Sequence, residues 1–168
     1  STCSERTGRT DFSFVFMTDI HLTWDSHAKD GFLAAINTIN TLHPDFVITG
    51  GDMIMDALGQ RYSRADSLYG LYSETVQNLR MPVYNTMGNH EIYGIYRSSG
   101  ADSLGPEYGE RMFEKRLGKS YYSFGHKGWK FFVLCSPQQN KGGYTGAIDS
   151  VQLSWIRKEL SETDTLMP

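Results

Sequence analysis

Side chains that can bind metal ions stand in three short clusters, each directly after an apolar run. Asp19 and His21 follow the first run, Asp52 follows the second, and Asn89 and His90 follow the third. Carboxylate and amide oxygens together with neutral imidazole nitrogens suit a divalent ion of intermediate hardness, such as Mn, Fe or Zn. Asp52 also has two carboxylate oxygens with which to bridge two ions. These residue types predict a metal centre if the fold brings the three clusters together.

The secondary structure expected around these clusters predicts that they lie close together in the fold. The apolar runs at 12–17 and 45–49 do not alternate cleanly, which is typical of strands covered on both faces. Between these two runs, apolar residues recur at helical spacing, which predicts a helix, and His43-Pro44 ends it. A second helical pattern over 62–79 leads to a third strand over 82–87. In sheets built from strand–helix–strand units, the loops beyond the carboxyl ends of the strands converge on one crevice.

The rest of the chain predicts smaller elements that flank the sheet. Four segments are expected after the third strand: a long functional loop over 88–109, a short helix over 107–117, a β-hairpin over 121–135 and a Gly-rich loop over 136–147. We interpret His126, which lies in the segment Gly125-His126-Lys127-Gly128, as a solvated turn residue. A last helix begins after Asp149, and Gln152 is the expected partner of a capping box.

The order of the three clusters resembles the calcineurin-like metallophosphoesterase family. The family signature is Asp-x-His, then Gly-Asp, then Gly-Asn-His-Asp/Glu, and this sequence has all three parts. In addition, Val133-Leu134-Cys135-Ser136 is similar to the family's Leu-Asp-Ser segment, with Cys135 in the place of Asp. The resemblance covers residues 12–160 and implies an α/β fold, a layered αββα sandwich of two β-sheets flanked by helices.

The resemblance also implies a role for each cluster residue. It places Asp19 and His21 on one divalent ion, Asp52 between two ions and Asn89 on the second. His90 is then the catalytic residue beside the substrate phosphate, and the Asn89 amide also contacts that phosphate. The implied reaction is hydrolysis of a phosphomonoester or phosphodiester, in a small molecule or a protein, by a hydroxide activated by two metal ions.

One further residue is a candidate for phosphate binding. Arg97 lies in the long loop after the third cluster, and its guanidinium suits a phosphate group. The alternative is a solvated loop arginine.

The sequence departs from the family in its later part. The family completes its metal site with a lone His and a Gly-His-x-His segment, and neither follows the last expected helix. We therefore expect an unpatterned segment over 1–11 and a single domain over 12–168, incomplete at its C-terminus. We also expect weak metal occupancy and little hydrolysis by this chain alone. An uncovered sheet edge would favour self-association, and the alternative function is a non-catalytic binding or assembly module on the same scaffold.

Composition excludes several other classes of protein. The chain of 168 residues has a net charge of −3, is 39% hydrophobic and contains only two cysteines. These values exclude a disordered chain, a disulfide framework and a basic groove for a nucleic-acid backbone, and no apolar run is long enough to span a membrane. The sequence does not begin with Met, and Cys3 lies close to its start. We therefore expect an exported protein with a lipid anchor at Cys3 after signal removal. The alternative is that the sequence begins at an arbitrary boundary.

Overall fold

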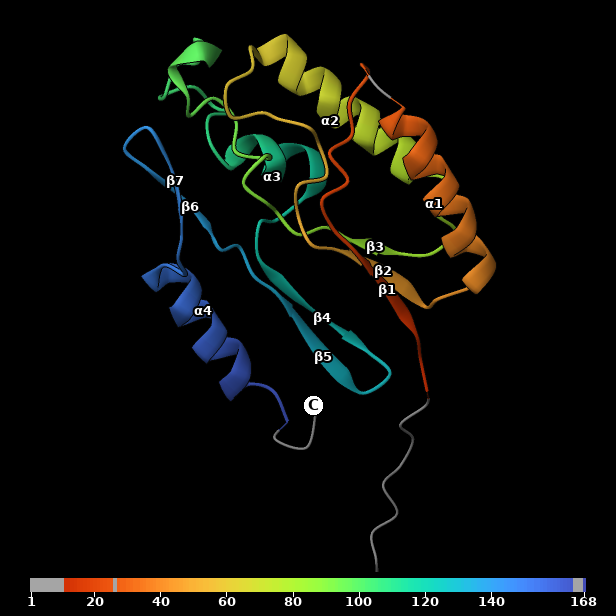
Figure 1. Ribbon diagram of the computed structural model, residues 1–168. Coiled ribbons are helices and arrows are strands. Elements are labelled where there is room, and N and C mark those ends of the chain that lie inside the picture. Colours follow the sequence, from red (N-terminus) through yellow and green to blue (C-terminus); the bar gives the residue numbers. More distant parts are fainter. Residues whose placement is uncertain (1–10, 26, 165–167) are drawn as a thin grey trace, which may run out of the picture.

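The N-terminal half of the protein forms a parallel sheet with helical crossovers. The computed structural model describes residues 11–25, 27–164 and 168. Its first elements are β1 (Phe14–Met17), α1 (Ala28–Leu42), β2 (Phe46–Thr49), α2 (Tyr62–Val76) and β3 (Val83–Tyr84). The strands pair in the order β1-β2-β3, with Phe14 opposite Phe46 and Val47 opposite Val83. Both helices lie on one side of this sheet (Figure 1). The predicted strand–helix–strand units are therefore confirmed.

Helices α1 and α2 bury their apolar faces in the core. Phe32 and Ile36 of α1 and Leu68 and Tyr72 of α2 are buried, and the Phe32 and Tyr72 rings stack with centroids 6.1 Å apart. Each large apolar side chain removed from water stabilises the fold by about 1.5–3 kcal/mol. Helix α1 ends before Pro44, as expected, and its last residue is followed by His43 in the left-handed region, with φ at 50°, a common way for a helix to end.

A second layer covers the other face of the parallel sheet. The later elements are η1 (Arg97–Ser99), α3 (Arg111–Leu117), β4 (Tyr122–His126), β5 (Trp129–Val133), β6 (Pro137–Asn140), β7 (Gly143–Gly146) and α4 (Ser150–Ser161). The antiparallel pair β4–β5 faces β1–β3 through aromatic side chains. The Phe46 ring lies 5.5 Å from Phe124 and 5.3 Å from Phe131, and Tyr84 stacks on Phe124 at 3.5 Å.

Helix α4 covers the outer face of β4–β5. The Phe132 and Trp155 rings meet with centroids 6.0 Å apart, and the Ser123 hydroxyl donates to Glu159 at 2.7 Å. The order of layers is therefore helices, parallel sheet, antiparallel sheet, helix (Figure 1). This order confirms the layered αββα fold.

The turn between β4 and β5 differs from the expectation at His126. Lys127 and Gly128 both have positive φ, at 44° and 82°, which is the geometry of a two-residue turn that matches strand twist. The turn is therefore tighter than expected, and His126 belongs to β4. Its Nε2 lies 3.1 Å from Asp45 Oδ1 and its ring meets Phe46 edge to face at 5.0 Å. The interpretation of His126 as a solvated turn residue is wrong.

The expected Gly-rich loop over 136–147 is in fact a hairpin. β6 and β7 pair antiparallel, with Asn140 opposite Gly143. Helix α4 begins as expected, because Asp149 Oδ1 accepts the Gln152 N–H at 2.7 Å. The Gln152 side chain does not complete a capping box. It instead binds both backbone groups of Cys135, accepting its N–H at 2.9 Å and donating to its C=O at 2.8 Å.

The remaining expectations concern the chain ends and the sheet edge. Cys3 and residues 1–10 lie outside the described residues. Within the described part, no helix combines the length and apolar character needed to cross a membrane. Phe14 and Phe16 are 44% and 60% exposed on β1, so an apolar strand lies at the surface. Association of this edge with a second copy stays a prediction.

Candidate metal centre

Backbone hydrogen bonds join the three loops that follow β1, β2 and β3. The His21 N–H donates to Asp52 C=O at 3.0 Å, and the Asp19 N–H donates to Gly51 C=O at 3.2 Å. The Ala57 N–H donates to His90 C=O at 2.8 Å. These bonds extend the contact between neighbouring strands past the sheet edge. The loops are therefore fixed relative to one another where the predicted metal ligands stand.

Three of the predicted site residues place their donor atoms close together. One donor atom each from His21, Asp52 and His90 lies within 4.8 Å of the other two. The imidazole rings of the two histidines meet edge to face, with centroids 4.6 Å apart. Two ligands of one ion at about 2.0–2.2 Å lie no more than about 4.4 Å apart. His21 and Asp52 are therefore spaced almost as ligands of one ion are, and His90 lies beside them.

The other predicted residues share a cleft with this cluster. A cleft of about 280 Å³ is lined by Asp19, Asp52 and Asn89 together, and Asp19 Oδ1 lies 3.7 Å from His21 Nε2. The structure thus brings all five cluster residues to one place. Arg97 is exposed in η1 and is not among the residues that line this cleft. The structure does not bring Arg97 to the predicted phosphate site.

The two histidines differ in their hydrogen bonds. His90 Nδ1 contacts the Met55 carbonyl oxygen, and because a carbonyl can only accept, Nδ1 carries a proton. The lone pair of a neutral His90 ring is then on Nε2. His21 Nδ1 is buried, and none of the described residues offers it a hydrogen bond. A buried nitrogen of this kind costs free energy unless something binds it, so this atom fits a group that the polypeptide itself does not supply.

The Glu91 side chain holds the loops after β2 and β3 together through hydrogen bonds. Its buried carboxylate accepts the backbone N–H groups of Asp52 at 2.9 Å, Met53 at 2.8 Å, Ile54 at 3.2 Å and Gly88 at 2.8 Å. Burial raises the pKa of Glu91 to about 7, while the backbone hydrogen bonds act in the opposite direction. With both oxygens used in this way, Glu91 supports the site and is not one of its ligands.

Backbone strain gathers at the same loops. Asp19, His21 and Asp52 have φ values of 56°, 46° and 51°, in the left-handed region that costs non-glycine residues about 1–3 kcal/mol each. Gly51 has a φ of 98°, and a Cβ there would lie 2.7 Å from Gly88 Cα, so only glycine fits. Strain that the surroundings maintain is typical of sites where side chains are held for function.

The structure adds cleft residues that the sequence did not indicate. Tyr144 and Thr145 of β7 line the cleft, as do Ser136 and Pro137 where β6 begins. Tyr144 is 42% exposed. Its position depends on the β6–β7 hairpin, and no local pattern predicted that hairpin.

Comparison with known proteins identifies the class to which this fold and site belong. The family model described as calcineurin-like phosphoesterase matches residues 12–164, so the chain belongs to that family, and the resemblance in its motifs is confirmed. No curated protein sequence matches the chain.

A solved structure supports the fold. The crystal structure of a dimetal phosphatase from Danio rerio superimposes with a TM-score of 0.59 at 16% sequence identity. The match covers 89% of this chain and 65% of that one. At this level of identity, the likeness concerns the fold alone, and the chain spans about two thirds of the length of that phosphatase.

Proposed function

We propose that this chain carries the catalytic cleft of a metal-dependent phosphoesterase, which hydrolyses a phosphomonoester or phosphodiester with two divalent ions, and that this chain alone is weakly active. The single observation that carries the proposal is the convergence of the loops after β1, β2 and β3. Asp52 and His90 contribute donor atoms to one cluster with His21, while Asp19 and Asn89 line the adjoining cleft.

The donor set fits divalent cations. Among the described residues, the cleft lining contains the carboxylates of Asp19 and Asp52 but no lysine or arginine, so its charge favours a cation. The unpartnered Nδ1 of His21 supports the same assignment. Asp19, His21 and Asp52 would hold one ion, and Asp52 with Asn89 would hold the second. This mixture of oxygen and imidazole donors suits Mn, Fe or Zn.

The chain's own residues would position the phosphate and manage the proton. When bound, the two ions supply a hydroxide nucleophile at neutral pH and offset charge on the phosphoryl oxygens. The Asn89 amide would donate a hydrogen bond to one of those oxygens. His90 would donate a proton from Nε2 to the leaving oxygen, and the Met55 carbonyl at Nδ1 stabilises the doubly protonated ring. Such acid catalysis contributes about 10²–10⁴ to the rate.

The test compares two aspartate variants of equal charge. Asp52→Asn keeps the shape of the side chain and an oxygen for the His90 N–H, which donates to Asp52 Oδ1 at 3.0 Å. Asp30→Asn is the control, because Asp30 is exposed on α1 and does not line the cleft. We expect titration calorimetry with Mn²⁺ or Zn²⁺ to show binding that Asp52→Asn weakens. With p-nitrophenyl phosphate, kcat/KM should fall by about 100-fold or more in Asp52→Asn only.

Two results would contradict the proposal. If Asp52→Asn and Asp30→Asn bind metal equally well, the cluster does not form the metal site. If the wild-type protein binds metal but releases no p-nitrophenolate from p-nitrophenyl phosphate or from bis(p-nitrophenyl) phosphate, the chain is not a phosphoesterase.

A further inference from the structure

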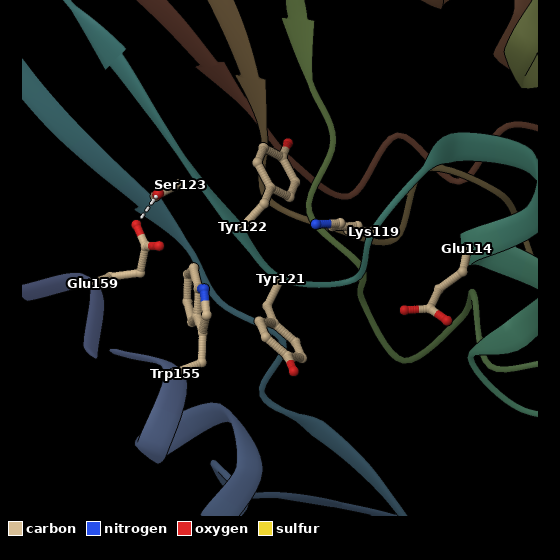
Figure 2. Close-up of a pocket in the computed structure, with 7 residues that line it drawn as sticks. All are labelled: Glu114, Lys119, Tyr121, Tyr122, Ser123, Trp155 and Glu159. Carbon is tan, nitrogen blue, oxygen red and sulfur yellow. Dashed lines mark hydrogen bonds between the residues drawn. The ribbon is translucent and has the colours of Figure 1, made fainter. Parts of the chain in front are cut away.

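A second cavity lies away from the metal cluster, between α3, β4 and α4. Its volume is about 440 Å³, and it shares no lining residue with the metal cleft. Figure 2 shows Glu114 of α3, Tyr121 before β4 and Trp155 of α4 around it. This volume lies in the range of small-molecule sites, about 300–1,000 Å³.

Two aromatic rings form a concave apolar corner on one side of the cavity. The Tyr121 and Trp155 centroids are 5.0 Å apart, and the ring planes are tilted by 55°. Trp155 also packs against Phe132 with centroids 6.0 Å apart, which restricts its rotation. Tilted rings held in this way offer flat faces for the C–H groups of a ligand without first having to be ordered.

Polar groups without partners surround this corner. Within the described part of the chain, Lys119 has neither a hydrogen bond nor an ion pair, and the Tyr121 hydroxyl and Trp155 Nε1 have no hydrogen bond. Glu114 accepts from the Ser120 hydroxyl at 2.9 Å through Oε1, which leaves Oε2 open. In Figure 2 the Glu114 carboxylate points toward Tyr121. The cavity thus offers one strong acceptor and three donors to a ligand.

The charges of the cavity balance. Glu159 is already paired, because its Oε2 lies 2.8 Å from Lys130 Nζ and accepts from Ser123 at 2.7 Å. The remaining charged groups are the Glu114 carboxylate and the Lys119 ammonium, of opposite sign. An anion such as phosphate would meet Glu114, and a cation would meet Lys119. Neither charge has an advantage, so the cavity favours a neutral ligand that both donates and accepts hydrogen bonds.

We infer that this cavity binds a neutral pyranose sugar. The C–H face of a pyranose ring matches the corner of Tyr121 and Trp155. Its hydroxyl groups both donate and accept, as Glu114 and Lys119 together require. The inference is independent of the proposed phosphoesterase function, because it involves none of the residues of the metal cleft.

The experiment follows the indole N–H of Trp155 by NMR in the full chain. Glucose, galactose, mannose, N-acetylglucosamine and cellobiose are titrated one at a time, and choline chloride and inorganic phosphate serve as charged probes. We expect at least one neutral sugar to shift the Trp155 signal in a saturable way at millimolar concentration, while the charged probes do not. Saturation by phosphate or choline with no response to any sugar would overturn the inference.

Variants connect the signal to the cavity. Lys119→Ala removes a side chain that has no partner, so folding is preserved, and we expect sugar affinity to fall by about 2–10-fold with the loss of one hydrogen bond. Trp155→Ala, followed through the Tyr121 ring signals, should abolish the response. Trp24→Ala is the matched control, because Trp24 is also exposed and lines neither cavity. Unchanged affinity in both Lys119→Ala and Trp155→Ala would show that the sugar binds elsewhere.

Discussion

The carboxylate of Glu91 accepts the backbone N–H of Asp52 at 2.9 Å, so a side chain from the loop after β3 fixes the loop after β2. The same carboxylate also accepts the N–H of Gly88 at 2.8 Å, which ties it to its own loop. Asp52 sits there with a φ of 51°, and this strained backbone persists because its N–H is held. The position of the predicted bridging ligand therefore depends on a residue that does not bind metal.

Replacing Glu91 with glutamine tests this dependence. Glutamine keeps one acceptor oxygen but presents N–H groups where the second carboxylate oxygen stood. Backbone N–H groups of the Asp52 and Gly88 loops would be left unpaired, each at a cost of about 1–3 kcal/mol. We expect urea unfolding to show that loss of stability, and calorimetry to show weaker binding of Mn²⁺ or Zn²⁺. Glu74→Gln, on the exposed face of α2, is the control, and equal stability of the two variants would contradict the prediction.

Acid should weaken the attachment of the β4–β5 hairpin to the parallel sheet through Asp45. A hydrogen bond from Lys127, helped by the Ser13 N–H and by His126, lowers the pKa of Asp45 to about 2 from its usual 3.8. A lowered pKa means that the stabilisation is fully present above about pH 4 and is lost as the pH falls toward 2. We expect the wild type to melt at a higher temperature than Asp45→Asn at pH 5, with the difference closing toward pH 2. A difference that stays constant over this range would contradict the assignment.

Gln152 should control the β6–β7 hairpin through Cys135. Its amide satisfies both backbone groups of Cys135, a residue that is itself buried. Gln152→Ala leaves a buried N–H and a buried C=O unpaired, at about 1–3 kcal/mol for each. We expect lower stability in urea and faster amide exchange in β6, compared with Gln77→Ala at the exposed end of α2. Unchanged exchange in β6 would show that the hairpin is held by other contacts.

Much of the fold could be predicted because it follows from local patterns. Apolar runs and helical spacing located β1, α1, β2 and α2, and the rule that parallel strands end at one edge placed the three polar clusters together. The failures lie where long-range pairing decides the conformation. His126 joined β4 because its ring contacts Asp45, just before β2, and Phe46, the first residue of β2. The segment 136–147 contains glycines typical of a loop, but its two halves pair with each other as the strands β6 and β7.

In the candidate site, too, the residues next to strands could be predicted from the sequence, and those positioned by long-range contacts could not. Asp19, Asp52 and Asn89 could be placed because each stands just beyond a strand, where the sheet dictates direction. Arg97 could not, because the long loop over 88–109 has no periodicity and its path depends on tertiary contacts. Tyr144 was missed for the same reason, since its place at the cleft depends on the β6–β7 pairing and on the contact between Gln152 and Cys135.

Tyr144 leads to a prediction about the leaving group, which rests on the proposed phosphoesterase activity. Tyr144 of β7 lines the same cleft as Asp19 and Asn89 and is partly exposed. An aromatic leaving group can stack on the Tyr144 ring, and such contacts contribute about 0.5–1.5 kcal/mol. We expect Tyr144→Ala to lower kcat/KM for p-nitrophenyl phosphate by about 2–10-fold and to leave kcat/KM for glycerol phosphate unchanged.

Two further variants separate stacking from other effects. Tyr144→Phe keeps the ring and removes only the hydroxyl, so it should retain the wild-type preference for the aryl ester. Tyr96→Ala removes another exposed tyrosine, one that does not line the cleft, and should change neither substrate. If Tyr144→Ala lowers the rates with the aryl and alkyl esters equally, the residue acts on the cleft as a whole, because a stacking contact can affect only a substrate that carries a ring.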